Sequence, residues 1–343
     1  DIQFRVRENG VVELADFSAQ EVKKEAMEPK EDIYYPAVEI HRSGTGSLNM
    51  HAYKNNINQS SVDFVYEKHE LKEQSGGKEL EIVMTSPEKL KAVYHMRLFD
   101  GVPAVQTWTE ITNEGSEDQG LTYVSSFVYQ GISRGGEKPY YKKTDIYVPF
   151  NSWSCEAQWQ KYDAETLNLN GMMVDGFNHQ GYGLNCYSYS GKGSWSTCEY
   201  LPMGIAEDRE TGETYIFQVE SSGQWLVEYG SAQGGNLYVT LSGAAEQEHG
   251  WYKNLKPGES FSTVPAGAAV VKGGLNPAVA ALTRYRRCVR RPNQDDVKLN
   301  VVFNDYMNCL MGDPTTEREL PIIDKAAELG CEYYCLYAGW YDD

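Results

Sequence analysis

The sequence predicts a mainly β protein: a large antiparallel β-sandwich over residues 1–275, followed by a short parallel β-α-β unit over residues 299–343. Two observations lead to this prediction. Up to about residue 275, apolar and polar residues alternate with a period of two, and Gly-rich turns interrupt the alternation at short intervals. Beyond residue 298 the pattern changes to short, continuous apolar runs on either side of one helix, which is typical of a parallel sheet.

The alternation marks individual strands in the first part of the chain. In residues 90–98 every second side chain is apolar, and residues 214–220 and 236–242 alternate in the same way. Such segments are typical of half-buried strands, with one face in the core and the other in water. Turn-forming pairs such as Asp100-Gly101 separate them. Many short strands with almost no helical period indicate an antiparallel sandwich.

A linking helix is predicted within residues 276–298. Asn276 is a suitable helix N-cap, and Pro277 has the fixed φ that suits the first helical position. Apolar residues then recur every three or four positions, and Pro292 ends the periodic segment. This helix is expected to separate the sandwich from the last part of the chain.

The last part of the chain is predicted to be one β-α-β unit. Residues 301–303 and 332–338 are apolar enough to be strands buried on both faces of a parallel sheet. Between them, Thr316 and Glu319 have the spacing of a capping box at a helix start. Pro321 is misplaced for that cap, so the helix is expected to begin later or to kink there.

Two parallel strands and one crossover helix cannot cover both faces of a sheet. Either this unit completes a fold that another chain supplies, or the 343 residues are a fragment of a longer protein. We expect the fragment.

The overall charge and composition exclude several classes of protein. With 49 acidic and 31 basic residues the formal net charge is −18, which disfavours nucleic acid and anionic membranes as partners. Apolar residues make up 41% of the chain, which excludes wholesale disorder, and no apolar run is long enough to span a bilayer. The 7 cysteines suggest no disulfide framework and are expected to be reduced thiols of a cytoplasmic protein.

The histidines and cysteines predict no metal site and no cofactor. None of the histidines is spaced like a metal ligand. These histidines are His41, His51, His69, His95, His179 and His249. Cys331 and Cys335 would form half of a four-cysteine site, but no second half is present in the sequence.

Several tryptophans have two possible roles. The segment from Trp153 to Trp159, with Glu156 between them, could be a carbohydrate-binding platform or a cross-strand aromatic pair. The pair is the favoured interpretation. Trp225 and Trp251 lie within the predicted sandwich and are expected to pack in its interior.

A series of motifs in a fixed order resembles a known family. A strand with Gln218 and Glu220 at its end precedes a Gly-x-Trp turn at residues 223–225, and residues 251–259 form a closing hairpin. Residues 301–340 follow with a strand, a helix and a second strand that ends in Gly-Trp. Together these features resemble the amino-terminal domain of glycoside hydrolase family 36, the bacterial α-galactosidases, followed by the start of the family's catalytic barrel.

The resemblance implies both a fold and an activity. The fold would be a large antiparallel β-supersandwich followed by the beginning of a (β/α)8 TIM barrel. The activity would be that of a retaining, α-galactosidase-like enzyme that hydrolyses terminal α-linked sugars of oligosaccharides or other α-glycosides and forms a homo-oligomer. Retention requires two carboxyl groups about 5–5.5 Å apart. In the family, later barrel strands supply these two Asp residues, so the catalytic residues of this protein are not identified in this chain.

The resemblance also points to substrate-binding residues at the ends of the two barrel strands. The family commonly ends its second strand with Asp-Asp-Gly-Trp. At the matching positions this chain has Tyr337, Ala338, Gly339 and Trp340, so both acids are absent. Asn304 and Asp305 directly follow the first strand. Parallel strands joined by one right-handed crossover end at the same rim, where barrel active sites lie.

We therefore predict that Asn304, Asp305, Tyr337 and Trp340 bind substrate. The alternatives are that Asp305 caps a turn and that Trp340 fills the barrel core. Two other functions also remain open for the chain as a whole: a non-catalytic β-sandwich for carbohydrate binding or oligomer assembly, and a glycosyl-transferring relative of the same enzymes.

Overall fold

The computed structural model describes residues 1–19, 25–31, 33–46, 53–169, 185–232 and 235–341. The chain divides into two compact units, Asp1–Cys288 and Val289–Asp343, and each is described by itself. His51 and His179 lie outside the described residues. None of the described helices combines the length and the apolar character that a membrane crossing requires.

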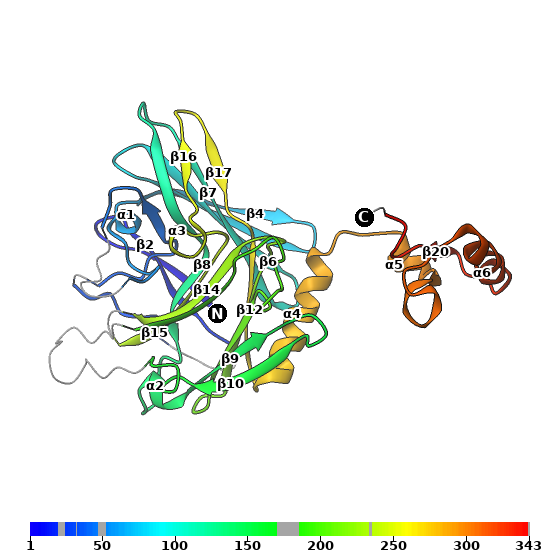
Figure 1. Ribbon diagram of the computed structural model, residues 1–343. Helices are drawn as coiled ribbons and strands as arrows, with labels where there is room; N and C mark the ends of the chain where they lie inside the picture. Colours follow the sequence, from blue (N-terminus) through cyan, green and yellow to red (C-terminus); the bar gives the residue numbers. More distant parts are fainter. Residues whose placement is uncertain (20–24, 32, 47–52, 170–184, 233–234, 342–343) are drawn as a thin grey trace. The chain divides into compact units, whose positions relative to one another are not determined.

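Two antiparallel sheets make up most of the first unit (Figure 1). The larger sheet contains, in order across it, β10 (Gln158–Asp163), β9 (Thr144–Phe150), β12 (Met203–Asp208), β13 (Glu213–Val219), β18 (Ala266–Lys272), β7 (Val102–Asn113), β6 (Leu90–Phe99), β5 (Gly77–Thr85) and β4 (Val65–Gln74), with β17 (Ser260–Ser262) paired to β7. The smaller sheet contains β11 (Cys186–Gly191), β14 (Trp225–Ala232), β15 (Asn236–Ser242), β8 (Gln119–Ile132) and β16 (Lys253–Leu255), with β3 (Ile40–Arg42) paired to β8. A separate hairpin joins β1 (Ile2–Val6) to β2 (Val12–Phe17).

The two sheets pack face to face through aromatic side chains. Phe127 of the smaller sheet contacts Phe217 of the larger sheet with ring centroids 5.9 Å apart, and Tyr129 contacts Tyr215 at 6.0 Å. Phe17 of the hairpin touches Phe127 at 5.5 Å. All these residues belong to one buried hydrophobic cluster. The predicted mainly β fold with large antiparallel sheets is confirmed.

The predicted alternation is confirmed for some strands and is too simple for others. Residues 90–98 form most of β6, whose exposure alternates along part of its length as expected. Residues 214–220 and 236–242 correspond to β13 and β15, but nearly every residue of these two strands is buried. The prediction of a half-buried strand is wrong here because further segments cover the polar face. On β15, for example, the Lys54 ammonium from outside the sheet lies 6.0 Å from the centre of the Tyr238 ring.

The helices are few and mostly short. They are α1 (Gln59–Val62), α2 (Tyr140–Lys143), α3 (Glu246–His249), α4 (Leu275–Val289), α5 (Asp295–Lys298) and α6 (Thr316–Glu328), with one π-helical turn, η1 (Tyr306–Leu310). Within the predicted linking segment, α4 begins at Leu275, so Asn276 is its second residue rather than its N-cap. The helix ends at Val289, ahead of Pro292. Its Tyr285 ring packs on Phe99 of β6, with centroids 5.6 Å apart.

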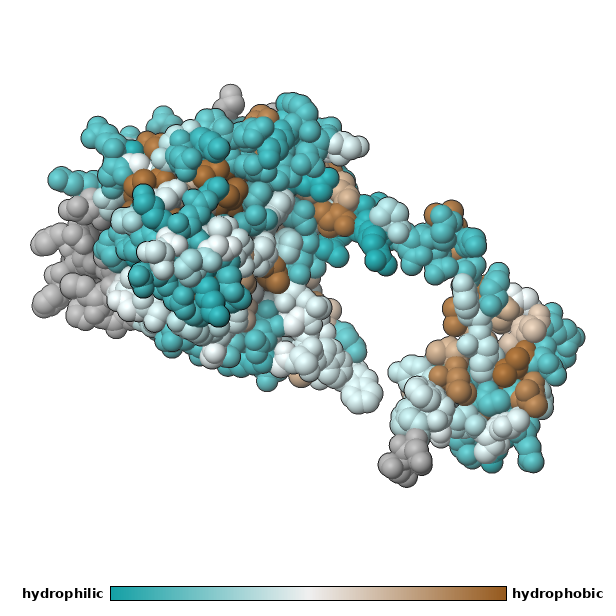
Figure 2. Space-filling model, turned by 90° about the horizontal axis from the view of Figure 1, so that it is seen from above, coloured by the Kyte–Doolittle hydropathy of each residue, from teal (hydrophilic) through white to brown (hydrophobic). Residues whose placement is uncertain are grey.

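The second unit contains a parallel pair of short strands, β19 (Val302–Asn304) and β20 (Tyr333–Cys335), joined through α6. The predicted parallel β-α-β order is confirmed, but the predicted burial of the strands is wrong. Val302 and Tyr333 are exposed, because the sheet of this unit has only these two strands. Figure 2 shows several hydrophobic residues among hydrophilic ones on the visible face of this unit.

The helix of the second unit also differs from its predicted start. It begins at Thr316 and runs through Pro321 to Glu328, and the N-cap is Thr315, which makes no side-chain capping bond. Pro321, in the second turn, has no N–H to donate to the Glu317 carbonyl. Glu317 is exposed, so water can donate a hydrogen bond to that carbonyl instead. The predicted capping box is absent because the Glu319 carboxylate accepts a hydrogen bond from the Tyr334 hydroxyl.

Candidate functional site

The carboxyl ends of β19 and β20 lie side by side in the second unit. The strands pair in register, with Asn304 opposite Cys335. The chain leaves β19 through Asp305 and leaves β20 through residues 336–341. Because parallel strands end at a common edge, this edge collects the side chains that were predicted to bind substrate.

Asp305 connects the two strand ends. Its side chain is only 2% exposed, and its Oδ1 atom accepts a hydrogen bond from the Tyr337 backbone N–H at 2.9 Å. Its own N–H donates to the Cys335 carbonyl at 3.3 Å. The other carboxylate oxygen, Oδ2, is buried and has no hydrogen-bond donor among the described residues. One oxygen therefore holds the strands together, and the other is left to accept a further hydrogen bond.

The neighbouring side chains differ in how they are held. Asn304 Oδ1 accepts a hydrogen bond from the Tyr306 N–H at 2.9 Å, so this side chain shapes the turn after β19. The Tyr306 and Tyr337 rings lie 5.1 Å apart. Trp340 is 63% exposed and its ring packs on Tyr341, with centroids 5.4 Å apart. The structure thus brings Asn304, Asp305 and Tyr337 together.

Gly339 explains the path of the chain next to Trp340. Its φ is +81°, in the region that favours glycine, and a Cβ at this position would lie 2.0 Å from the Gly312 carbonyl oxygen. The segment that carries Trp340 therefore lies against the turn at Gly312. A larger residue at position 339 would push the two turns of this edge apart.

A second aromatic group lies in the first unit, where Trp153 and Trp195 line a shallow depression of about 630 Å³. The other lining residues are Phe150, Asn151, Ser152, Cys198, Glu199 and Tyr200. Trp153 is 81% exposed and Trp195 is 56% exposed. Phe150 and Tyr200 contact each other at the base, with centroids 5.3 Å apart. The lining contains four aromatic side chains and no aliphatic one.

Two of the predictions for the tryptophans are confirmed and one is wrong. Trp225 is fully buried, and its Nε1 donates to the Ser196 carbonyl at 2.7 Å. Trp251 packs on Phe261 with ring centroids 5.2 Å apart, so both predictions of a packing role are confirmed. The favoured cross-strand pairing of Trp153 is wrong, because Trp153 lies in the turn before β10 while Trp159 lies within that strand, opposite Pro149.

The turn that carries Trp153 has an unusual backbone. Ser154 and Ala157 both have left-handed conformations, with φ of 60° and 52°. Asn151 stabilises this backbone in part, because its Oδ1 accepts a hydrogen bond from the Ala157 N–H at 2.9 Å. Non-glycine residues in this region are strained, and such strain is found more often at functional sites than elsewhere.

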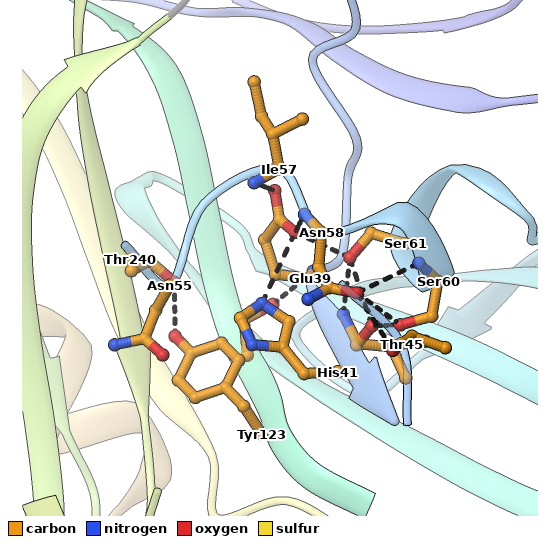
Figure 3. A network of polar contacts seen from close by, with 12 residues as sticks. Glu39, His41, Thr45, Asn55, Ile57, Asn58, Ser60, Ser61, Tyr123 and Thr240 are labelled. Atoms are coloured by element: carbon orange, nitrogen blue, oxygen red, sulfur yellow. Dashed lines mark hydrogen bonds and ion pairs between the residues drawn. The ribbon is translucent and has the colours of Figure 1, made fainter. Parts of the chain in front are cut away.

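Two buried carboxylates, Glu39 and Glu228, form the polar centre of the first unit, and Figure 3 shows the contacts of Glu39. Glu39 is fully buried and accepts hydrogen bonds from the Ile57 N–H at 2.7 Å and the Ser61 hydroxyl at 2.6 Å. Burial raises the pKa of Glu39 to about 7. The His41 imidazole lies 3.9 Å from the same carboxylate, and burial lowers the pKa of His41 to about 3.

Glu228 has a matching role next to Glu39. It accepts hydrogen bonds from the Asn55 N–H at 2.9 Å and the Tyr238 hydroxyl at 2.6 Å. Burial raises the pKa of Glu228 as well. The two glutamates thus hold the loop over residues 55–61 against the sandwich. Because their oxygens are engaged by this loop, they are poorly placed to act as a catalytic acid and base.

Sequence reasoning missed this buried pair and the exposed position of Trp195. Glu39 and Glu228 are 189 positions apart by residue number and meet only through the fold. The signal that could have marked them is an acidic residue inside an otherwise apolar strand pattern, as in the strand that carries Glu228.

Comparisons with known proteins give structural matches only. No protein-family model matches this chain, and no curated protein matches it significantly. Among solved structures, the A355E variant of the α-galactosidase AgaA of Geobacillus stearothermophilus in complex with 1-deoxygalactonojirimycin superposes with a TM-score of 0.75 at 16% identity, over 100% of this chain and 49% of that chain. An AgaA variant with bound stachyose gives 0.69 at 18% identity, over 92% of this chain and 41% of that chain.

A third match comes from another organism. The α-galactosidase of Lactobacillus brevis gives a TM-score of 0.70 at 15% identity, over 99% of this chain and 47% of that chain. The chain thus spans about half the length of the solved enzymes that it matches. The resemblance found in the sequence is confirmed at the level of the fold: this chain has the fold of the amino-terminal part of glycoside hydrolase family 36 α-galactosidases.

Proposed function

We propose that this chain is the amino-terminal part of a retaining α-glycosidase of the α-galactosidase type, whose full-length form hydrolyses terminal α-linked sugars of oligosaccharides. One observation carries the proposal. The similarity to AgaA extends over 100% of the chain, so it includes the β-α-β unit as well as the sandwich. A sandwich alone is common to many functions, whereas this order of sandwich and parallel unit is much more specific.

Residues 299–343 are proposed to begin a (β/α)8 barrel after the sandwich of residues 1–275 and the linking segment of residues 276–298. The parallel pairing of β19 with β20 supports this. The exposure of Val302, Leu320 and Tyr333 also supports it, because a closed barrel would cover such side chains with further strands and helices.

Within that barrel, Asn304, Asp305, Tyr337 and Trp340 are proposed to line the sugar pocket. The free Oδ2 of Asp305 is a suitable acceptor for a sugar hydroxyl, and Tyr337 carries a phenol in place of the family's carboxylate. An aromatic face beside hydrogen-bonding groups is a typical sugar site. The two catalytic Asp residues would come from later strands.

The proposed partners are an oligosaccharide, such as the raffinose and stachyose bound by AgaA, and further copies of the same protein. A cytoplasmic location is also proposed. All seven cysteines are free, which suits a reducing compartment.

The test compares this chain with the longer protein that its gene encodes. We expect the longer protein to release aryl groups from α-galactosides and galactose from raffinose, and this chain alone to show no turnover. If the longer protein transfers the sugar to an acceptor instead of water, it is a glycosyl-transferring relative. If the reading frame ends after Asp343, or if this chain alone is active, the proposal is wrong.

The aromatic depression favours a second candidate function, carbohydrate binding by the sandwich itself. Trp153 and Trp195 expose flat aromatic faces beside the Glu199 carboxylate, and sugars stack on such faces. We would measure binding of neutral oligosaccharides to this chain by tryptophan fluorescence. Binding that is lost in Trp153→Ala and Trp195→Ala but retained in Trp159→Ala would support this function. Equal binding by all three variants would exclude the depression as the site.

A further inference from the structure

Three potential metal ligands meet on the larger sheet, on the face opposite the core. Glu79 and Glu81 lie on β5, and His95 lies directly opposite Glu81 on β6. Their neighbours along the strands, Ile82 and Tyr94, belong to the hydrophobic core. Since side chains alternate between the two faces of a strand, Glu81 and His95 point the other way.

The distances between these ligand atoms suit a metal ion. His95 Nδ1 lies 3.1 Å from Glu79 Oε1 and 3.7 Å from Glu81 Oε1. Metal–ligand bonds of about 2.1 Å in a tetrahedral arrangement place two ligand atoms roughly 3.4 Å apart. One ligand atom from each residue lies within 4.8 Å of the other two. No other group of three such side chains gathers this closely in the described part of the chain.

His95 is held in place but is not satisfied by hydrogen bonds. Its ring stacks on Trp108 of β7 with centroids 4.5 Å apart and planes 6° apart. His95 is 7% exposed and Glu79 is 9% exposed, so both are nearly buried. The Nε2 atom of His95 is buried without a partner among the described residues. Burial and stacking fix the ring, so that Nδ1 stays directed at the two glutamates.

Two further side chains, Gln74 and Lys72, contact the carboxylates of Glu79 and Glu81. Gln74 Nε2 donates to Glu79 Oε2 at 2.7 Å, which leaves Oε1 directed at His95. Lys72 Nζ lies 2.5 Å from Glu81 Oε1 and is 38% exposed along its side chain. Lys72 is thus a partly exposed cation that pairs with the Glu81 carboxylate. A divalent ion would compete with it for Glu81.

We propose that Glu79, Glu81 and His95 form a binding site for one divalent cation of the zinc type. One imidazole nitrogen and two carboxylates are ligands that Zn²⁺ accepts, and a water molecule would complete four-fold coordination. Gln74 would orient the Glu79 ligand. The sequence predicted no metal site, because these ligands come from different strands and carry no ligand spacing along the chain.

The first experiment measures Zn²⁺ binding to this chain by calorimetry after treatment with a chelator. We expect one ion per chain. His95→Gln and Glu81→Gln should each weaken binding by at least roughly tenfold. The matched control is His69→Gln, because His69 lies on the adjacent strand β4 and contacts Tyr66 rather than the three ligands. Unchanged affinity in His95→Gln, or no binding at all, would overturn the proposal.

The second experiment distinguishes a metal site from an ordinary surface ion pair and does not depend on a buried substitution. Lys72→Met should strengthen Zn²⁺ binding by roughly thirtyfold, the effect in water of one unit charge about 4 Å from a doubly charged ion. Lys78→Met removes a comparable lysine that pairs with Glu73 and should leave the affinity unchanged. Weaker or unchanged Zn²⁺ binding in Lys72→Met would contradict the site.

Fluorescence provides an independent readout of the same site. Cu²⁺ is expected to bind the same ligands and quench Trp108, because that indole stacks on His95. The quenching should disappear in Trp108→Phe, while the calorimetric affinity for Zn²⁺ stays within about twofold. Quenching that persists in Trp108→Phe would place the ion elsewhere.

Discussion

The Asp305 carboxylate accepts a hydrogen bond from the Tyr337 backbone N–H at 2.9 Å, so one side chain joins the carboxyl ends of two parallel strands. The two residues are 32 positions apart in the sequence. In a parallel barrel this edge is the place where substrates bind. The contact therefore gives Asp305 a structural role through Oδ1 and leaves Oδ2 without a hydrogen-bond donor among the described residues.

Asp305→Asn tests that second role in the longer protein. The amide oxygen can still accept the Tyr337 N–H, but the charge that would hold a sugar hydroxyl is lost. We expect kcat/KM to fall roughly ten- to hundredfold, which corresponds to about 1.5–3 kcal/mol for a charge-assisted hydrogen bond. Steady-state kinetics on an aryl α-galactoside measure the effect.

The control for this substitution is Asp313→Asn. Asp313 is an exposed acid of the same unit that pairs with Arg318. Its loss should leave kcat/KM unchanged. Equal activity of Asp305→Asn and the wild type, with equal thermal stability, would mean that Asp305 only holds the strands.

Trp340 is expected to act through its ring. Trp340→Ala should lower kcat/KM at least roughly tenfold in the longer protein, and Trp340→Phe should recover part of the loss, because a smaller aromatic face still stacks on a sugar. If both variants keep full activity on raffinose and on an aryl glycoside, Trp340 does not contact substrate.

Glu39 should make stability depend on pH. Its pKa is about 7 in the folded chain against 4.5 for the ordinary carboxyl, so the unfolded chain releases its proton first as pH rises. Below pH 4.5, protonated Glu39 contributes on the order of 3 kcal/mol to the free energy of unfolding. This contribution is lost as the pH rises to about 7.

Urea unfolding of the wild type and of Glu39→Gln between pH 4 and pH 8 measures this contribution. His41 contributes with the opposite sign, since its lowered pKa destabilises the folded chain in acid. Since the pKa of His41 is about 3 in the folded chain, His41 stays neutral there above pH 5, and the difference between the two curves from pH 5 to pH 8 reports Glu39. A difference that does not change with pH would contradict the account.

Trp225→Ala should destabilise the first unit by about 3–5 kcal/mol, because it removes a fully buried indole and its bond to the Ser196 carbonyl. Trp153→Ala removes an exposed ring and should cost less than about 0.5 kcal/mol. Denaturant unfolding of both variants checks the contrast. Similar losses in the two would mean that the surface turn is part of the core.

The strands were predictable where burial alternates. The pattern at residues 90–98 predicted β6 because its core face and its wet face differ in side-chain type. The same rule predicted β13 and β15 as strands but misjudged their second face, since covering residues such as Lys54, which lies over Tyr238 of β15, come from far away in the sequence. Local patterns do not contain that information.

The sites were less predictable than the strands. The strand ends at Asp305 and Tyr337 could be placed together because one crossover fixes the relative direction of two parallel strands. The cluster of Glu79, Glu81 and His95 could not, because it depends on the register between β5 and β6. The exposed position of Trp153 depends on the turn in which Ser154 and Ala157 have left-handed backbone conformations, and no residue type in that turn predicts such a backbone.

The most direct measurement of the central claim is covalent labelling of the longer protein with a mechanism-based α-galactosidase inhibitor. A retaining enzyme forms a glycosyl–enzyme ester on its nucleophile, and mass spectrometry of the digested protein locates that residue. We predict a single label on an Asp that follows Asp343 in the chain. A label on any residue from 1 to 343, or full turnover without a trapped intermediate, would contradict the account.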